Sequence, residues 1–535
     1  MKSPEEFRNK VYEKQAVRLT VRKRRRRQAM VCVPLAFLIV LGSVFLPRVL
    51  TDGSLPFARS GKIPLMLQVT SPAVPTKMSA TDEQTSHVEE RKKLEEEREA
   101  LEKTLKEAQG EQKEETSMED ELKKRLEEMQ RKVEEARARE RAETEVDSGF
   151  ADSVNQFARD SSVLLSKDFG ENACYSPLSM YYAMALTGCG AGGQTKEEFQ
   201  SILYGDDNWI AEQCRKFYQN HYFEGETNTF RLENSLWLDG NYDFSGPFIS
   251  HARNDFFSSL FRVDFSDPAL SGEMTKWVSE QTDGQLSPSF TFEDHQMLYL
   301  LNTILYEAEW NQRFSPENNT QGEFRKADGS TVTAEYMNRD YSADGYYKGN
   351  GFTAASLSLK SHDRMVFVLP DEGVSTEELL SDPNLFEEMF LSKPLPEHEY
   401  GLVRWSIPKF SFTCEYDMQN VWKGLGLERA FDPVLADFSD MGKLEMYLTK
   451  TTQNIHMDIS ENGVTAAAFS EVITHDGINE LEGERVDMVL DRPFLFAVLG
   501  KDAIMDNEIT LETLLFVGVC GDPAASDVGS AAAAS

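Results

Sequence analysis

The chain has 535 residues, with 56 Lys or Arg against 90 Asp or Glu and a formal net charge of −34. Hydrophobic residues make up 40% of the chain, which is enough for a large core and excludes a globally disordered protein. The acidity argues against a nucleic-acid partner, which would require a basic face. Six scattered cysteines without a Cys-x-x-Cys pair exclude a disulfide framework and a zinc module, so no metal site is expected.

The N-terminal region has the pattern of a membrane anchor. Residues 1–28 are strongly basic, and residues 29–47 carry no charged side chain. A stretch of about 20 apolar residues is long enough to cross the hydrocarbon core of a bilayer as a helix. Because basic residues stay on the cytoplasmic side, we expect residues 1–28 to form a cytoplasmic tail and everything after the helix to lie outside the cell. A cleaved signal peptide is the alternative, but no small-residue cleavage site follows.

Two further segments separate this anchor from the globular region. Residues 48–81 are rich in Pro and Ser and are expected to form a linker. Residues 82–146 are dominated by Glu, Lys, Arg and Leu and are expected to form a charged helical stalk. Its heptad core positions are only partly apolar, with a polar middle around Gly110. The stalk is therefore either a coiled coil that joins copies of the chain into a homo-oligomer, or a solitary helix stiffened by Glu–Lys pairs.

A single globular domain is expected over residues 147–523, followed by a disordered tail of small residues, 524–535. Helical spacing comes early in this domain, and short β-branched or aromatic runs bounded by turn residues come late. That order predicts an α+β fold. The helical segments are Ser161–Leu165, Leu178–Leu186 and Glu197–Leu203, and the strand-like runs are Ala354–Leu359, Met365–Leu369, Val403–Phe412 and Leu514–Val519.

Motifs of catalysis and of cofactor binding are missing from the sequence. It holds no nucleophile elbow, no Walker loop and no zinc-protease spacing, so we expect neither an enzyme nor a cofactor. The glycines of Gly188–Gly193 match a dinucleotide-binding pattern, but they follow a helical stretch, whereas the phosphate-binding turn must follow a strand. A loop that ends a helix explains them better.

The most informative stretch is Glu461–Thr474, read with the period of two that a β-strand imposes. One face is small or β-branched and uncharged, and it could slide between two strands of an existing sheet without burying an ion. Gly463 supplies a pivot before it. On these residues alone, an ordinary strand with one exposed face remains the alternative. The uncharged face consists of Val464, Ala466, Ala468, Ser470, Val472 and Thr474, and the other face of Thr465, Ala467, Phe469, Glu471, Ile473 and His475.

This stretch resembles the hinge of the serpins, and further serpin-like motifs follow one another in family order across the whole domain. The resemblance begins at Asn172, Ser176, Pro177 and Ser179 and ends near Leu515–Gly518. The motifs between are Gly190–Thr195, Asn302–Tyr306 with Trp310 and Phe314, then Thr320, Phe324, Val332 and Met337, then Ile407–Phe410, Leu425–Leu427, Ala436–Ser439 and Asp491–Phe496.

The resemblance implies a serpin fold, with helices around a large central antiparallel-rich sheet and a mobile reactive loop. It also implies a suicide inhibitor of serine proteases, with cysteine proteases as a further class. In such an inhibitor a protease cuts the loop, and the cut loop then enters the main sheet as a new strand. The hinge residues implied are Glu461, Gly463, Val464, Thr465, Ala466, Ala467 and Ala468.

A polar gate between the central strands is also implied, and here the sequence departs from the family. Ser176, Ser179 and Asn302 fit the gate, but the position of its usual histidine falls on Gln453. An amide can still donate and accept hydrogen bonds, so the gate can be kept without a pH-sensitive member. The segment from Gly463 to Pro493 is also longer than in a typical serpin.

The family's spacing between hinge and cut places the reactive bond at Gly477–Ile478. A cut after Arg485 would leave roughly 26 Å of extra extended chain, enough slack for the protease to escape. We therefore expect the cut between His475 and Leu481, where small and aliphatic neighbours favour an elastase-like or subtilisin-like protease. Together these features predict a membrane-tethered, extracellular protease inhibitor at the cell surface. The alternative is a non-inhibitory serpin that acts as a protease substrate or a binding scaffold.

Overall fold

The computed structural model describes residues 145–530, except 226, 294–295, 392–398, 444, 465–483, 502–503, 506–507, 510–511 and 526–528, together with five positions between 124 and 132. The predicted basic tail 1–28, transmembrane helix 29–47 and linker 48–81 lie outside the described residues, as does nearly all of the stalk 82–146. Within the described part of the chain, no helix is long and apolar enough to cross a membrane.

Six of the described helices precede residue 282, and shorter ones follow later. The segments with helical spacing all lie inside α4, α5 and α6, which confirms those predictions. The expected order of helices first and strands afterwards is wrong in part, because strands begin before α5 and α10 to α12 come late. The helices are α4 (Ser148–Leu165), α5 (Pro177–Gly188), α6 (Gly193–Leu203), α7 (Asp207–His221), α8 (Gly246–Asn254), α9 (Leu270–Gln281), α10 (Thr376–Ser381), α11 (Pro383–Phe386) and α12 (Gln419–Leu425), with helical turns η1 (Ser166–Asp168), η2 (Pro316–Asn318), η3 (Glu387–Leu391) and η4 (Arg429–Phe431).

Helix α5 is the central helix of the domain, since every one of its residues is buried. Ser176 caps its N-terminus by accepting a hydrogen bond from the amide of Ser179, and Pro177 takes the first helical position, where no amide hydrogen is needed. The helix ends at Gly188, and α6 begins at Gly193, so the glycine-rich segment is a helix-ending loop as expected. A Cβ on Gly190 would lie 2.5 Å from the side chain of Met441, so glycine is needed there for close packing.

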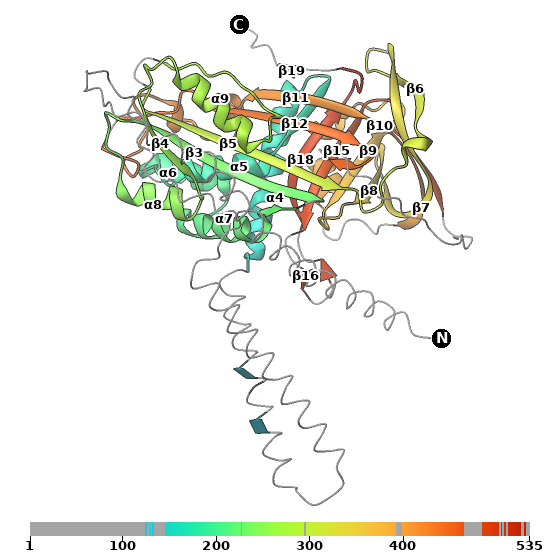
Figure 1. Ribbon diagram of the computed structural model, residues 1–535, viewed down its shortest axis with the longest axis horizontal. Coiled ribbons are helices and arrows are strands. Elements are labelled where there is room, and N and C mark those ends of the chain that lie inside the picture. Colours follow the sequence, from blue (N-terminus) through green and yellow to red (C-terminus); the bar gives the residue numbers. More distant parts are fainter. Residues whose placement is uncertain are drawn as a thin grey trace, which may run out of the picture. The chain divides into compact units, whose positions relative to one another are not determined.

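An eight-stranded central sheet has the order β19-β11-β12-β13-β5-β3-β2, with β4 beside β3. Its neighbours are antiparallel except for the β3–β4 and β11–β19 pairs, and Figure 1 shows its long strands side by side. The strands are β2 (Phe223–Glu224), β3 (Asn228–Asp239), β4 (Ser259–Val263), β5 (Leu298–Glu309), β11 (Phe410–Asp417), β12 (Thr452–Ser460), β13 (Gly463–Val464) and β19 (Gly529–Ser530).

A second sheet of nine strands has the order β1-β18-β15-β9-β8-β7-β10-β14, with β6 beside β7. The run Val403–Phe412, predicted as one strand, is instead split between β10 and β11, which belong to different sheets. Pro408, which has no amide hydrogen, ends the first of them. The strands are β1 (Asn172–Tyr175), β6 (Thr320–Arg325), β7 (Thr331–Gly349), β8 (Phe352–Ser358), β9 (Arg364–Pro370), β10 (Glu399–Pro408), β14 (Arg485–Val489), β15 (Phe494–Lys501) and β18 (Glu512–Cys520), and a separate pair joins β16 (Ile504–Met505) to β17 (Glu508–Ile509).

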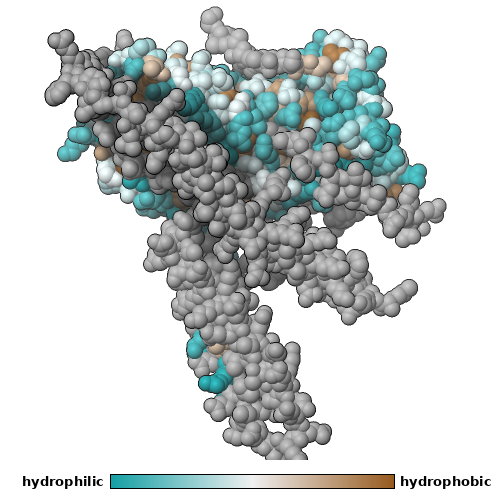
Figure 2. Space-filling model, viewed as in Figure 1, coloured by the Kyte–Doolittle hydropathy of each residue, from teal (hydrophilic) through white to brown (hydrophobic). Residues whose placement is uncertain are grey.

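The central sheet is covered on both faces. Ile304, Tyr306 and Ala308 of β5 belong to the large core that includes α5, and we call this side the inner face. Leu301 of β5 packs in a second apolar cluster with Val278 of α9, on the side that we call the outer face. Helix α9 lies across this outer face in Figure 1. The described residues visible on the surface in Figure 2 are mainly hydrophilic, as expected for so acidic a chain.

The C-terminal tail requires a correction. Residues 524–535 were expected to be disordered, but Gly529–Ser530 form the short strand β19, which pairs in parallel with Cys414 and Glu415 of β11. Strand β11 would otherwise be an edge of the central sheet. An edge strand presents unpaired amide and carbonyl groups that a nearby segment of any sequence can bind through its backbone, so the side-chain composition of the tail carries no signal for this pairing.

Candidate functional site at the opening of the central sheet

Gly463 and Val464 form the two-residue strand β13, which lies between β12 and β5. Val464 pairs with Ile459 on one side and with Ala308 on the other. Its side chain is fully buried (0% exposed) in the same apolar core as those two residues, so it points to the inner face. The first member of the uncharged face identified in the sequence is therefore inside the sheet.

Glycine is required at position 463 by a close backbone approach. Its φ is +155°, and a Cβ built on it would lie 2.0 Å from the carbonyl oxygen of Ala308. Any side chain would push β13 away from β5 because the obstacle is backbone rather than a flexible side chain. Gly463 thus lets the chain turn into the space between the two strands.

A polar tether holds the chain just before this entry. The Glu461 carboxylate accepts hydrogen bonds from Asn319 and from Nζ of Lys409, the latter at 3.1 Å, and Lys409 also contacts Glu335 at 3.3 Å. Burial acts to raise the pKa of Glu461, but hydrogen bonds from its own backbone amide, Asn319 and Lys409 outweigh it, so that the pKa is lowered. The carboxylate is therefore stabilised in its charged form.

Aromatic residues after β5 bind the backbone of the same segment. The indole nitrogen of Trp310 donates to the carbonyl of Ser460 at 2.8 Å, and the Trp310 amide donates to the carbonyl of Asn462 at 2.9 Å. The amide of Phe314 donates to the carbonyl of Glu461 at 3.1 Å. These bonds fix the turn between β12 and β13 to the end of β5.

All four gate residues named from the sequence come together beneath the sheet. Gln453 of β12 is 4% exposed, and its amide group makes two hydrogen bonds with the backbone of Ser176: Nε2 donates to the carbonyl at 2.9 Å, and Oε1 accepts from the amide at 3.1 Å. The hydroxyl of Ser179 donates to Oδ1 of Asn302 on β5. The N-terminus of α5 is thereby bonded to both strands that flank β13.

A fifth member of this network, Asn234 of β3, is not among the gate residues expected from the sequence. Its side chain is 1% exposed, and its Oδ1 accepts a hydrogen bond from Nδ2 of Asn302 at 2.8 Å. Asn234 interrupts the apolar alternation Phe230, Leu232, Leu236 and Leu238 on one face of β3, and this is a signal that could have identified it, because a buried polar side chain requires a partner.

Beyond Val464, β5 and β12 do not pair with each other within the described residues. A hollow that is partly open to solvent lies between them farther along, at Thr303 of β5 and Asn454 of β12, and its empty space of about 370 Å³ includes the solvent at its mouth. Both strands contribute to it, and the segment that includes the end of α9 covers it. Its lining consists of Val278, Leu286, Pro288, Phe290, Leu300, Leu301, Asn302, Thr303, Thr452 and Asn454.

The predicted reactive bond Gly477–Ile478 and the hinge residues 465–468 lie outside the described residues, between β13 and β14. The chain is fixed again at Glu484, whose carbonyl accepts from the amide of Leu402 at 2.7 Å and whose carboxylate contacts Lys348 at 2.6 Å. Arg485 is the first residue of β14 and pairs with Leu402 of β10. A cut after Arg485 would therefore require a sheet strand to open.

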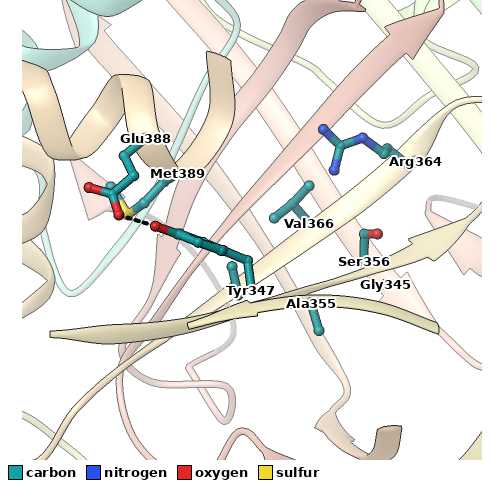
Figure 3. Close-up of a pocket in the computed structure, with 9 residues that line it drawn as sticks. Gly345, Tyr347, Ala355, Ser356, Arg364, Val366, Glu388 and Met389 are labelled. Carbon is teal, nitrogen blue, oxygen red and sulfur yellow. Dashed lines mark hydrogen bonds between the residues drawn. The ribbon is translucent and has the colours of Figure 1, made fainter. Parts of the chain in front are cut away.

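A second hollow lies on the other sheet, between β7, β8, β9 and the turn η3 (Figure 3). Three of the polar side chains that line it already have partners within the protein. The Tyr347 hydroxyl donates to Glu388 at 2.5 Å, and Arg364 forms an ion pair with Glu512 at 2.6 Å. We assign no function to this hollow.

Comparisons with known proteins agree with this architecture. The family model Serpin (serine protease inhibitor) matches residues 152–523, and the chain belongs to the serpin family. Serpin-ZX of Arabidopsis thaliana is 26% identical over 380 residues, which cover 68% of this chain and 94% of that protein. The native state of the thermophilic serpin tengpin has a TM-score of 0.61 at 24% identity, covering 71% of this chain and 96% of that one.

A complex of thyroxine-binding globulin with thyroxine also has this fold, with a TM-score of 0.59 at 20% identity, covering 70% of this chain and 99% of that one. The serpin fold predicted from the sequence is therefore confirmed for the globular domain. Serpins are generally protease inhibitors rather than enzymes, and the protease-inhibitor superfamily is the class to which this chain belongs.

Proposed function

We propose that the protein inhibits extracellular serine proteases by trapping the acyl-enzyme through insertion of its cleaved loop. The observation that carries this proposal is β13, because two residues of the loop already occupy the space between β12 and β5. Beyond Val464, β5 and β12 form no ladder with each other within the described residues, and a hollow lies between them at Thr303 and Asn454. A strand that has begun between two separated partners can be extended without first breaking their pairing.

The register of β13 also supports the position of the cut. Val464 pairs with Ala308, and in the same antiparallel register Thr474 would reach Leu298, the first residue of β5. The uncharged face would then be buried along the whole length of β5. Gly477–Ile478 lies shortly after Thr474, so a protease bonded there would be drawn to the far end of the sheet.

In this mechanism the inhibitor supplies a cleavable loop and a central sheet into which the cleaved loop inserts. The protease serine attacks the carbonyl carbon of Gly477, an ester forms as the Gly477–Ile478 bond breaks, and the amino group of Ile478 takes up a proton as the leaving group. The fragment that begins at Ile478 stays in the fold through β14, β15 and β18. Insertion of the upstream loop then pulls the esterified protease across the sheet, and the ester is not hydrolysed because the catalytic triad loses its geometry. The added strand stabilises the product through backbone hydrogen bonds on both sides.

The decisive experiment incubates the full chain with elastase-like, subtilisin-like and trypsin-like proteases. We expect a covalent complex that survives SDS with an elastase-like or subtilisin-like enzyme, and a released peptide that begins at Ile478. A released peptide that begins after Arg485 would contradict the assigned bond. Clean cleavage of the loop by every protease, without any complex, would contradict inhibition.

That last outcome would favour the second candidate, a non-inhibitory serpin that serves as a protease substrate or as a binding scaffold. The presence of Gln453 in place of the usual gate histidine and the long loop favour it. Thyroxine-binding globulin illustrates a serpin fold in a complex with a small molecule.

We further propose that residues 29–47 anchor the protein in the cell membrane, with residues 1–28 in the cytoplasm and the serpin domain outside the cell. The stalk would hold the serpin domain away from the membrane. If the stalk forms a coiled coil, it would also join copies of the chain. The uncharged segment behind a basic cluster supports this orientation. The full chain should resist carbonate extraction from membranes, and external protease should reach the serpin domain in intact cells. Release into the carbonate supernatant would contradict the anchor.

A further inference from the structure

We propose that the cavity between β5, β12 and the segment after α9 is the receiving site for the ring of Phe469 when the cleaved loop inserts. This inference rests on the proposed function, because it assigns a side chain to a strand that forms only on insertion. Its basis is the agreement between three independent features of the chain: the register of β13, the two-residue alternation of the loop, and the residues that line the cavity.

The register places Phe469 at the cavity. Val464 pairs with Ala308 of β5 and with Ile459 of β12. Carried forward along the same antiparallel ladders, residue 469 falls between Thr303 and Asn454, and residue 471 falls between Leu301 and Thr452. All four of these residues line the cavity. The cavity is therefore at the level of residues 469–472 of the loop, because Leu300 also lines it and falls opposite residue 472.

The alternation of the strand places Phe469 on the correct face. Val464 points to the inner face, so the even-numbered loop residues follow it and the odd-numbered ones point outward. Leu301, an outer-face residue of β5, packs with Val278 and Leu286 in the apolar cluster beside α9. An inserted Phe469 would therefore point beneath this segment rather than into the main core.

The lining of the cavity matches an aromatic ring better than a carboxylate. Val278, Leu286, Pro288 and Phe290 form its cover, and Lys, Arg and His are absent from the described residues that line it. Enclosing an apolar ring there removes it from water, whereas Glu471 would lose its hydration without gaining a cation. Of the two outer-face residues brought to this level, Phe469 is thus the one that the site accommodates.

The matched pair of variants is Phe469→Ala and Ile473→Ala. Each removes an apolar side chain from the same face of the loop, but residue 473 falls opposite Tyr299, which does not line the cavity. The intact and loop-cleaved forms of each full-length variant are unfolded in guanidinium chloride. We expect Phe469→Ala to lower the midpoint of the cleaved form by roughly 0.5 M and to leave the intact form unchanged, with a smaller effect for Ile473→Ala.

The outcomes distinguish this inference from the proposed function. If cleavage does not raise the midpoint of the wild-type protein, loop insertion itself fails. If cleavage raises the midpoint of the wild-type protein and raises that of Phe469→Ala by the same amount, loop insertion is supported and the receiving site is wrong.

A spectroscopic readout tests the location without removing the side chain. In Phe469→Trp, cleavage should shift the added tryptophan emission to shorter wavelength and protect it from acrylamide, whereas the emission of Ile473→Trp should remain more quenchable. An added tryptophan that stays fully quenchable at position 469 overturns the inference.

Size-exclusion chromatography shows whether the ring enters its own chain or another copy. The cleaved protein should elute in the same assembly state as the intact form. A new, larger species that appears on cleavage would mean that the ring had entered another copy, which also overturns it.

Discussion

Gln453 bears most directly on whether the gate works without its usual histidine. Its amide group binds both the carbonyl and the amide of Ser176, at the N-terminus of the buried helix α5. An imidazole could be protonated at mildly acidic pH and lose its single acceptor nitrogen. The neutral amide keeps both bonds at every pH, so this part of the gate is insensitive to acid.

We expect Gln453→Ala to lower the free energy of unfolding of the intact protein by about 1–3 kcal/mol, because two buried backbone groups of Ser176 lose a partner. Urea unfolding measures the difference. Asn454→Ala is the control, since Asn454 is the adjacent residue on the outer face and lines the cavity instead. Equal losses in the two variants would contradict the role assigned to Gln453.

The tether at Glu461 predicts a dependence on pH. The folded-state pKa of Glu461 lies below its ordinary value of 4.5, so its stabilising effect is present above that value and is lost as the pH falls through the lower folded-state pKa. We expect Lys409→Met to reduce the loss of stability between pH 5 and pH 3, because it removes one cause of the lowered pKa. Unfolding midpoints measured across this range test it, and an unchanged slope would contradict the tether.

At the scale of elements, β13 is the part of the loop that already lies in the sheet before cleavage, and insertion would extend it. Val464→Arg would place a guanidinium in the apolar core between β12 and β5, at a cost of about 3–5 kcal/mol, so the strand should leave the sheet and insertion should fail. The variant should be cut as a substrate and give no SDS-resistant complex. Thr465→Arg is the control, because the register brings residue 465 to Glu307 and Asp458, whose carboxylates favour a cation. An undiminished complex with Val464→Arg would contradict insertion.

Local patterns predicted some elements well. The helical spacing of Leu178–Leu186 identified α5, and the alternation after Gly463 assigned Val464 to the face that is buried. The depth to which the hinge enters the sheet could not be read from the sequence, because it depends on how far β5 and β12 are held apart by α5. The split between β10 and β11 was missed for a similar reason: both halves of the run are apolar, and only packing assigns them to different sheets.

For the whole molecule, the proposed function requires the intact fold to be a kinetic trap. The central sheet is covered on both faces and held by the gate, and the proposed function requires it to accept another strand between β5 and β12. Such a protein persists because its rearrangement is slow rather than because its fold is the most stable one. Cleavage of the loop would release this constraint.

The most direct test compares the thermal unfolding of the intact protein with that of the same protein nicked within the loop. If the severed segment completes the sheet, the nicked form should survive temperatures at which the intact form has fully unfolded. If the two forms unfold at the same temperature, no strand has been added, and the protein is not an inhibitor that works by insertion.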